Sequence, residues 1–138
     1  MSRFVLDSSV AFKTLILETG SDKAKRLIDD YRNGVHELIA PDILPIEVGH
    51  ALTRAERMGR VSAADGYSLW SSLMADCPRL FPSLALMPRA YSTSSSAKLG
   101  IYDCLYVALA EQEQCEIVTD DARLCALFPR QAVLLYSL

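Results

Sequence analysis

Short apolar runs alternate with longer amphipathic stretches along this chain. Between the runs, apolar residues recur at the spacing of three and four that marks one face of a helix. The runs interpreted as strands lie at residues 4–6, 35–40, 79–84, 116–119 and 132–136. The stretches with helical spacing lie at residues 8–16, 21–32, 44–58, 62–73, 90–99, 103–114 and 121–127. This alternation predicts a three-layer α/β/α domain with a mainly parallel central sheet.

Individual residues mark where several of these elements begin. Pro45 falls in the first turn of its predicted helix, where a missing N–H does no harm. Ser62 opens a capping box at the start of the next helix. Pro82 makes the strand at 79–84 an edge or irregular one, because proline cannot donate a hydrogen bond within a sheet. No linker or repeat interrupts the pattern, so we expect residues 1–138 to form one domain.

The composition indicates a compact folded protein without an obvious charge signature. Of the 138 residues, 51% are hydrophobic and 22% are charged. The formal net charge of −3 lacks the basic balance by which many nucleic-acid binders are recognised. That charge argues against a passive, high-affinity nucleic-acid binder. It says little against an enzyme, whose local field can differ from the average.

Cysteine usage and hydropathy indicate the compartment. The four cysteines have no paired spacing, so neither a zinc site nor a disulfide framework is predicted. The first residues lack the long apolar segment of a signal peptide, and no stretch reaches the roughly 18 apolar residues of a membrane span. We therefore expect a protein of the reducing cytoplasm.

Four carboxylates stand directly beside apolar stretches. They are Asp7, Glu47, Asp103 and Asp121. Removing a charge from water is unfavourable unless the charge is paired or bound to a metal. If the four converge, repulsion adds to this cost, at roughly 4 kcal/mol for two like charges about 4 Å apart at an effective dielectric of about 20. A divalent cation would compensate both effects.

The predicted elements bring some of these acids together. Asp7 and Asp121 each follow a predicted strand, and ligands of open α/β sheets bind at the carboxyl ends of the strands. Asp103 opens a predicted helix, where an N-cap role is an equally good interpretation. Glu47 lies inside a helix, and taken alone it would be an ordinary boundary residue. The constellation of acids is therefore more informative than any of its members.

The other residues narrow the chemistry. Only His36 and His50 are present, and neither lies beside a serine or cysteine in a nucleophile motif. The six glycines form no phosphate-binding loop. An all-carboxylate site suits hard cations such as Mg²⁺ and Mn²⁺, which can activate a water and clamp the oxygens of a phosphodiester.

In four segments the chain resembles the PIN-domain ribonucleases, and within them the VapC-type toxins of bacterial toxin–antitoxin pairs. The matching segments are residues 4–10, 40–48, 101–110 and 117–124. Each is weak alone, but four in this order form a fairly specific signal. The resemblance implies a PIN-like fold over 1–138 and an acid site made by Asp7, Glu47, Asp103 and Asp121.

The resemblance also implies how that site works. It implies one or two bound Mg²⁺ or Mn²⁺ ions, with Ser9 and Thr119 supporting the carboxylates or the attacking water. It further implies cleavage of RNA phosphodiester bonds, a homodimer, and neutralisation by a cognate antitoxin protein. The family's Thr-x-Asp pattern selects Asp121, although the adjacent Asp120 could contribute.

Other interpretations of the sequence remain open. One alternative is a non-catalytic PIN-like scaffold that acts through protein contacts, which would have no need of converging acids. Another is an aspartyl-phosphate receiver, which needs an acidic pair that the Asp7 segment does not supply. Arg54, Arg57 and Arg60 could contact RNA phosphates, but a solvated basic helix face is the simpler interpretation.

Overall fold

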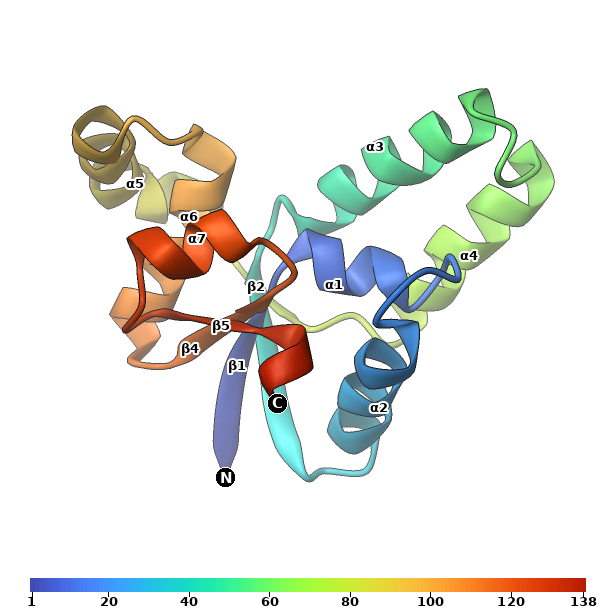
Figure 1. Cartoon of the computed structure of the whole chain (residues 1–138), viewed down its shortest axis with the longest axis horizontal. Coiled ribbons are helices and arrows are strands. Elements are labelled where there is room, and N and C mark those ends of the chain that lie inside the picture. The colour runs from blue at the N-terminus through green and yellow to red at the C-terminus, as the bar shows by residue number, and fades with distance from the viewer.

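A sheet of five parallel strands lies at the centre of the computed structural model, which describes all residues from Met1 to Leu138 (Figure 1). The strand order is β3-β2-β1-β4-β5, and every neighbouring pair is parallel. The strands are β1 (Ser2–Leu6), β2 (His36–Pro41), β3 (Arg79–Phe81), β4 (Glu116–Thr119) and β5 (Ala132–Leu134).

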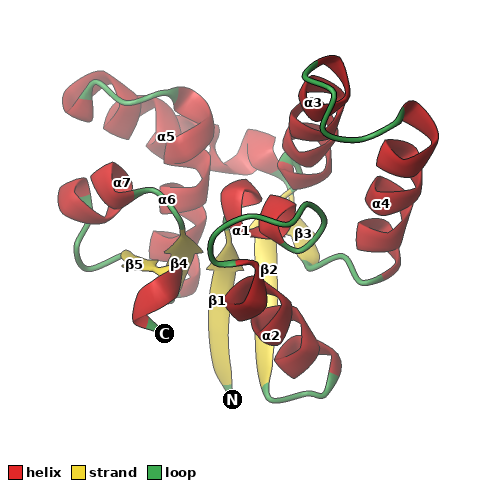
Figure 2. Ribbon diagram, turned by 45° about the vertical axis from the view of Figure 1, so that its right-hand side comes forward, coloured by secondary structure: helices red, strands yellow, loops and turns green.

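Helices cover both faces of this sheet (Figure 2). The first group comprises α1 (Ser8–Lys13), α2 (Ser21–Arg32), α3 (Leu44–Arg57) and α4 (Ala63–Ala75). The second comprises α5 (Ser83–Ala97), α6 (Ile101–Glu113) and α7 (Ala122–Leu127). A short 3₁₀ helix, η1 (Leu135–Ser137), ends the chain. The predicted three-layer fold is confirmed, and its sheet is entirely parallel.

The strands separate two apolar cores, one on each face. In β1, Val5 packs with α5 and α6, whereas Leu6 packs with the helices of the first group. In β4, Ile117 and Val118 divide in the same way. This alternation follows from the two-residue period of a strand.

Helix α6 is the most deeply buried helix. Its seven consecutive residues from Cys104 to Ala110 are all buried, because α6 packs against the sheet on one side and α5 on the other. A helix that is apolar all round is expected in such a position. None of the helices is both long and apolar enough to cross a membrane.

The sheet order places a topological switch beside β1. After β1 the chain continues to β2 and β3 on one side, and it later returns to β4 and β5 on the other. Leu6 pairs with Val118, so the first residue after β1, Asp7, lies beside Thr119 at the end of β4. Ligand sites of open parallel sheets form at such a point.

Several predicted boundaries were wrong. Helix α1 ends at Lys13 and does not reach residue 16. The strand predicted at 79–84 ends at Phe81, and the helix predicted from residue 90 already begins at Ser83. The strand predicted at 132–136 ends at Leu134, where η1 follows.

The earlier start of α5, at Ser83, has a simple physical reason. Pro82 is the N-cap of α5, and Pro88 lies inside the helix. An internal proline normally disfavours a helix, so the local sequence concealed the first two turns. The prediction of an edge strand was nevertheless correct, since β3 is the outermost strand of the sheet.

We expect Leu109→Ala to lower the free energy of unfolding by about 2–5 kcal/mol, the usual cost of truncating a buried leucine. Leu109 is fully buried in α6. Leu84 is 86% exposed on α5, so Leu84→Ala serves as the control and should stay within about 0.5 kcal/mol of the wild type. Urea denaturation measures both values, and equal effects would contradict the placement of α6 in the core.

Candidate active site

Asp7 is the most buried of the four predicted acids. It directly follows β1, its side chain is almost inaccessible, and its backbone N–H donates to the carbonyl of Val118 (3.2 Å). Two hydroxyl groups donate to its Oδ2 atom, Ser9 Oγ at 2.6 Å and Thr119 Oγ1 at 2.8 Å. Neither of these bonds uses Oδ1.

The same two hydroxyls also accept hydrogen bonds from the turn that follows β4. Ser9 Oγ accepts from the backbone N–H of Asp120 (3.2 Å), and Thr119 Oγ1 accepts from that of Asp121 (3.1 Å). Each hydroxyl therefore links the buried Asp7 carboxylate to the backbone of this turn. The structure thus brings Ser9 and Thr119 to the positions that a supporting role requires.

Asp121 is the N-cap of α7. Its Oδ1 atom accepts hydrogen bonds from the backbone N–H groups of Arg123 (2.9 Å) and Leu124 (3.2 Å). These bonds satisfy donors that would otherwise lack partners at the helix start. Asp121 therefore has a structural role in addition to any chemical one.

Asp103 lies in the first turn of α6 and is not its cap. The N-cap of this helix is Gly100, and no side chain makes a capping bond there. The alternative interpretation of Asp103 as an N-cap is therefore wrong. Its half-buried carboxylate makes no hydrogen bond or salt bridge within the chain, so it is available to an external ligand.

Glu47 is held by a residue that sequence analysis did not identify. Glu47 lies in the first turn of α3, and Tyr106 Oη donates to its Oε1 atom at 2.7 Å. Tyr106 is buried in α6, three residues after Asp103, so both side chains lie on one helix face. This spacing was the only signal in the sequence that connected Tyr106 with the acids.

The four carboxylates influence one another electrostatically. Burial raises the pKa of Asp7, as does the nearby Asp121, although the hydroxyls of Ser9 and Thr119 oppose the effect. Burial also raises the pKa of Glu47, which Asp7 and Asp103 raise further.

Asp103 behaves in the same way. Burial raises its pKa, and the carboxylates of Asp7 and Asp121 add to the effect, while Arg123 partly offsets it. All four predicted acids therefore lie at the same end of the sheet, where Asp7 and Asp103 raise the pKa of Glu47 and Asp121 raises that of Asp7 and Asp103. No three His, Cys, Asp or Glu side chains form a ready-made metal cage.

Residues 4–128 match the PIN domain. This chain belongs to the PIN-domain family. Among curated relatives, Ribonuclease VapC9 of Mycobacterium tuberculosis is 31% identical over 120 residues, which cover 87% of each chain. This likeness identifies the chain as a VapC-type PIN domain and confirms the resemblance drawn from the four segments.

Solved structures share the fold. PAE2754 from Pyrobaculum aerophilum superimposes with a TM-score of 0.75 at 20% identity, covering 99% of this chain and 92% of that one. A chain of VapBC2 from Rickettsia felis, solved bound to a promoter DNA fragment, gives a TM-score of 0.66 at 11% identity. The match covers 96% of this chain and 98% of that one.

In this PIN domain, the carboxylate of Asp120 forms an ion pair with Lys13 and does not join the four acids. Its Oδ2 atom lies 3.1 Å from the Lys13 ammonium, which also contacts Glu18 at 3.1 Å and the carbonyl of Thr19 at 2.7 Å. Burial lowers the pKa of Lys13, but its hydrogen bonds to Glu18 and Asp120 outweigh this and raise it. Nothing in the sequence distinguished Lys13 from an ordinary surface lysine.

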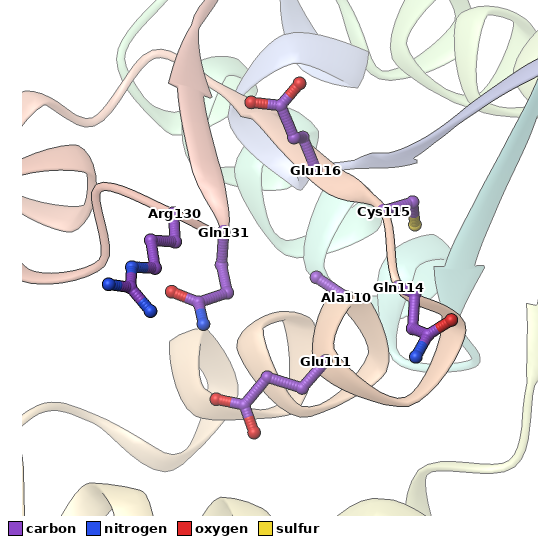
Figure 3. A pocket seen from close by; sticks show the side chains of 7 residues that line it. All are labelled: Ala110, Glu111, Gln114, Cys115, Glu116, Arg130 and Gln131. Atoms are coloured by element: carbon purple, nitrogen blue, oxygen red, sulfur yellow. The ribbon is translucent and has the colours of Figure 1, made fainter.

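A separate hollow lies at the opposite end of the strands, near the amino end of β4 (Figure 3). It has a volume of about 330 Å³. Figure 3 shows its two acids, Glu111 and Glu116, pointing away from each other, and Glu111 is already paired with Arg89 at 2.8 Å. This hollow therefore lacks the converging acids that lie at the carboxyl ends of the strands.

The buried Asp7 carboxylate gives a testable pH dependence. Its folded pKa is raised above the ordinary value of 3.8, so its contribution to stability is complete below 3.8 and is lost as the pH rises through the folded pKa. Asp7→Asn cannot ionise and can still accept both hydroxyl hydrogen bonds. In EDTA, its melting temperature should match the wild type near about pH 4 and exceed it increasingly toward about pH 8.

Asp22→Asn is the matched control, because Asp22 is exposed on α2. This variant should not show the excess in melting temperature that grows toward about pH 8 in Asp7→Asn. A difference between Asp7→Asn and the wild type that does not change with pH would show that ionisation of Asp7 has no energetic cost.

Proposed function

We propose that this protein is a metal-dependent endoribonuclease that hydrolyses RNA phosphodiester bonds and acts as the toxin of a toxin–antitoxin pair. The single observation that supports this most strongly is the convergence of Asp7, Glu47, Asp103 and Asp121 at the switch point of the sheet. The match to the PIN domain and the ribonuclease names of the curated relatives support it independently.

The donor set fits Mg²⁺ or Mn²⁺. Carboxylate oxygens are the preferred ligands of these hard cations, and the four acids offer only such oxygens. We infer that Asp7, Glu47, Asp103 and Asp121 hold one or two ions. When bound, such an ion activates a water and stabilises the charge that develops on the phosphate.

The protein's own residues prepare these ligands. Ser9 and Thr119 both donate to Asp7 Oδ2, so neither hydroxyl occupies Oδ1. Burial, the carboxylate of Glu47 and that of Asp7 all raise the pKa of Tyr106, so its hydroxyl stays protonated and can orient Glu47. Fixing ligands through surrounding hydrogen bonds is a general feature of metal sites.

The four acids have different roles in this proposal. Asp7 and Asp103 bind the principal ion directly. Asp121 orients the attacking water or a second ion, because its Oδ1 atom is already used to cap α7. Asp120 contributes through its backbone N–H and not through its carboxylate, which faces Lys13.

The partners follow from the same proposal. RNA is the substrate, and a cognate antitoxin protein covers the site until it is removed. The solved structures that share this fold include VapBC2 of Rickettsia felis and FitAcB of Neisseria gonorrhoeae, which supports an antitoxin partner. We further propose that residues 1–138 act as a single PIN-like domain and that the protein forms a homodimer, whose mass analytical ultracentrifugation would measure.

We expect Asp103→Asn to lower the rate of RNA cleavage with Mn²⁺ by at least about 100-fold. A bound metal contributes several kcal/mol to catalysis, and each 1.36 kcal/mol is about tenfold in rate. The metal-free variant should melt at the same temperature as the wild type or higher, since it removes a repelled charge without breaking a hydrogen bond. Marked unfolding would indicate a structural role for Asp103.

Single substitutions should rank the acids. Asp7→Asn should impair cleavage as much as Asp103→Asn, Asp121→Asn less, and Asp120→Asn least. Cleavage of a generic RNA with Mn²⁺ gives the order, with Asp22→Asn as the control that retains full activity. If Asp120→Asn abolishes cleavage while Asp121→Asn remains active, the fourth acid is wrongly assigned. A wild type that cleaves no RNA with either ion would support a non-catalytic scaffold.

A further inference from the structure

A second cavity opens directly beside the acid site, between α3 and α6. Its volume is about 510 Å³, within the range of about 300–1,000 Å³ that is typical of small-molecule sites. Its lining consists of Ser8, Ile43, Ile46, Glu47, His50 and Tyr102. Because Glu47 belongs to both, the cavity and the acid site are continuous.

Two large side chains of this lining are exposed to solvent. Ile46 is 72% exposed and Tyr102 is 60% exposed. They flank two of the acids in sequence, since Ile46 precedes Glu47 on α3 and Tyr102 precedes Asp103 on α6. Neither side chain adds to the core. An exposed apolar surface at a cavity mouth indicates a ligand-binding surface.

The charge of the site determines what such a surface can contribute. An RNA strand brings negative phosphates to a protein of net charge −3 whose site gathers four carboxylates. This charge disfavours the phosphate contacts that dominate binding by basic proteins. Affinity for single-stranded RNA can also come from stacking of unpaired bases on aromatic rings, which does not depend on charge.

We propose that this cavity binds one unstacked nucleobase of the RNA strand, with its face against the Tyr102 ring. The inference rests on the proposed ribonuclease function. Ile46 contacts the opposite face of the base, and His50, one turn after Ile46 on α3, offers a polar group to its edge. Since Tyr102 adjoins Asp103, a base in the cavity places a neighbouring phosphate over the acids.

Binding of a short fluorescein-labelled single-stranded RNA tests this proposal. Fluorescence anisotropy is measured with Ca²⁺ in place of Mg²⁺, for the intact strand and for the same strand with abasic central nucleotides. The wild type should bind the intact strand about tenfold more tightly, the effect expected from stacking of one base. Tyr102→Ala should lose this preference by weakening only its binding to the intact strand.

Two further variants separate stacking from other effects. Tyr102→Phe keeps the ring and should retain the wild-type preference. Tyr91 is 67% exposed on α5 and does not line the cavity, so Tyr91→Ala should also behave as the wild type. The proposal is overturned if Tyr102→Ala binds both strands as the wild type does, if it weakens both equally, or if the wild type shows no preference for bases.

Cleavage of the intact strand with Mn²⁺ is measured in parallel. A base preference that depends on Tyr102, without any cleavage, would support the base-binding cavity and refute the nuclease function. Cleavage without any dependence on Tyr102 would support the nuclease function and refute the cavity. Loss of dimerisation in Tyr102→Ala with unchanged RNA binding would assign this surface to a second copy of the chain.

Discussion

The buried carboxylate of Asp7 is the group around which the site is organised. It stands where β1 and β4 meet at their carboxyl ends, and desolvation there disfavours its charge. The hydroxyls of Ser9 and Thr119 offset part of that cost by donating to one of its oxygens. Because both hydroxyls also accept from the turn after β4, the position of Asp121 depends on the same contacts.

Helix α6 connects the core with the site. Its buried middle turns hold it against the sheet. Asp103 lies in its first turn, and Tyr106 follows one turn later. Tyr106 reaches across to Glu47 on α3, so two helices on opposite faces of the sheet are joined by a hydrogen bond at the site. The chemistry of the site thus depends on packing that extends through both cores.

The sequence by itself determined the layers and the approximate positions of the strands, and it singled out the four acids as candidates. Strand periodicity and helix spacing are local properties, so β1, β2, β4 and most helices could be predicted with small errors at their ends. Asp7 and Asp121 could be placed at one edge because parallel strands share a direction. Local rules failed at Pro82 and Pro88, where tertiary packing of α5 outweighs the usual effect of proline.

Only the tertiary structure decided which acid has which partner. From the sequence, Asp103 was as readily interpreted as a helix N-cap as a member of the acid site. In the structure, Asp121 is the acid that makes the capping bonds. Asp120 and Asp121 are adjacent in sequence, yet one carboxylate faces Lys13 and the other caps α7. Lys13, Tyr106 and the cavity beside Tyr102 carried no distinctive signal, because their roles arise from contacts between residues far apart in the chain. Such contacts depend on the packing of helices across the sheet, which the pattern of neighbouring residues does not encode.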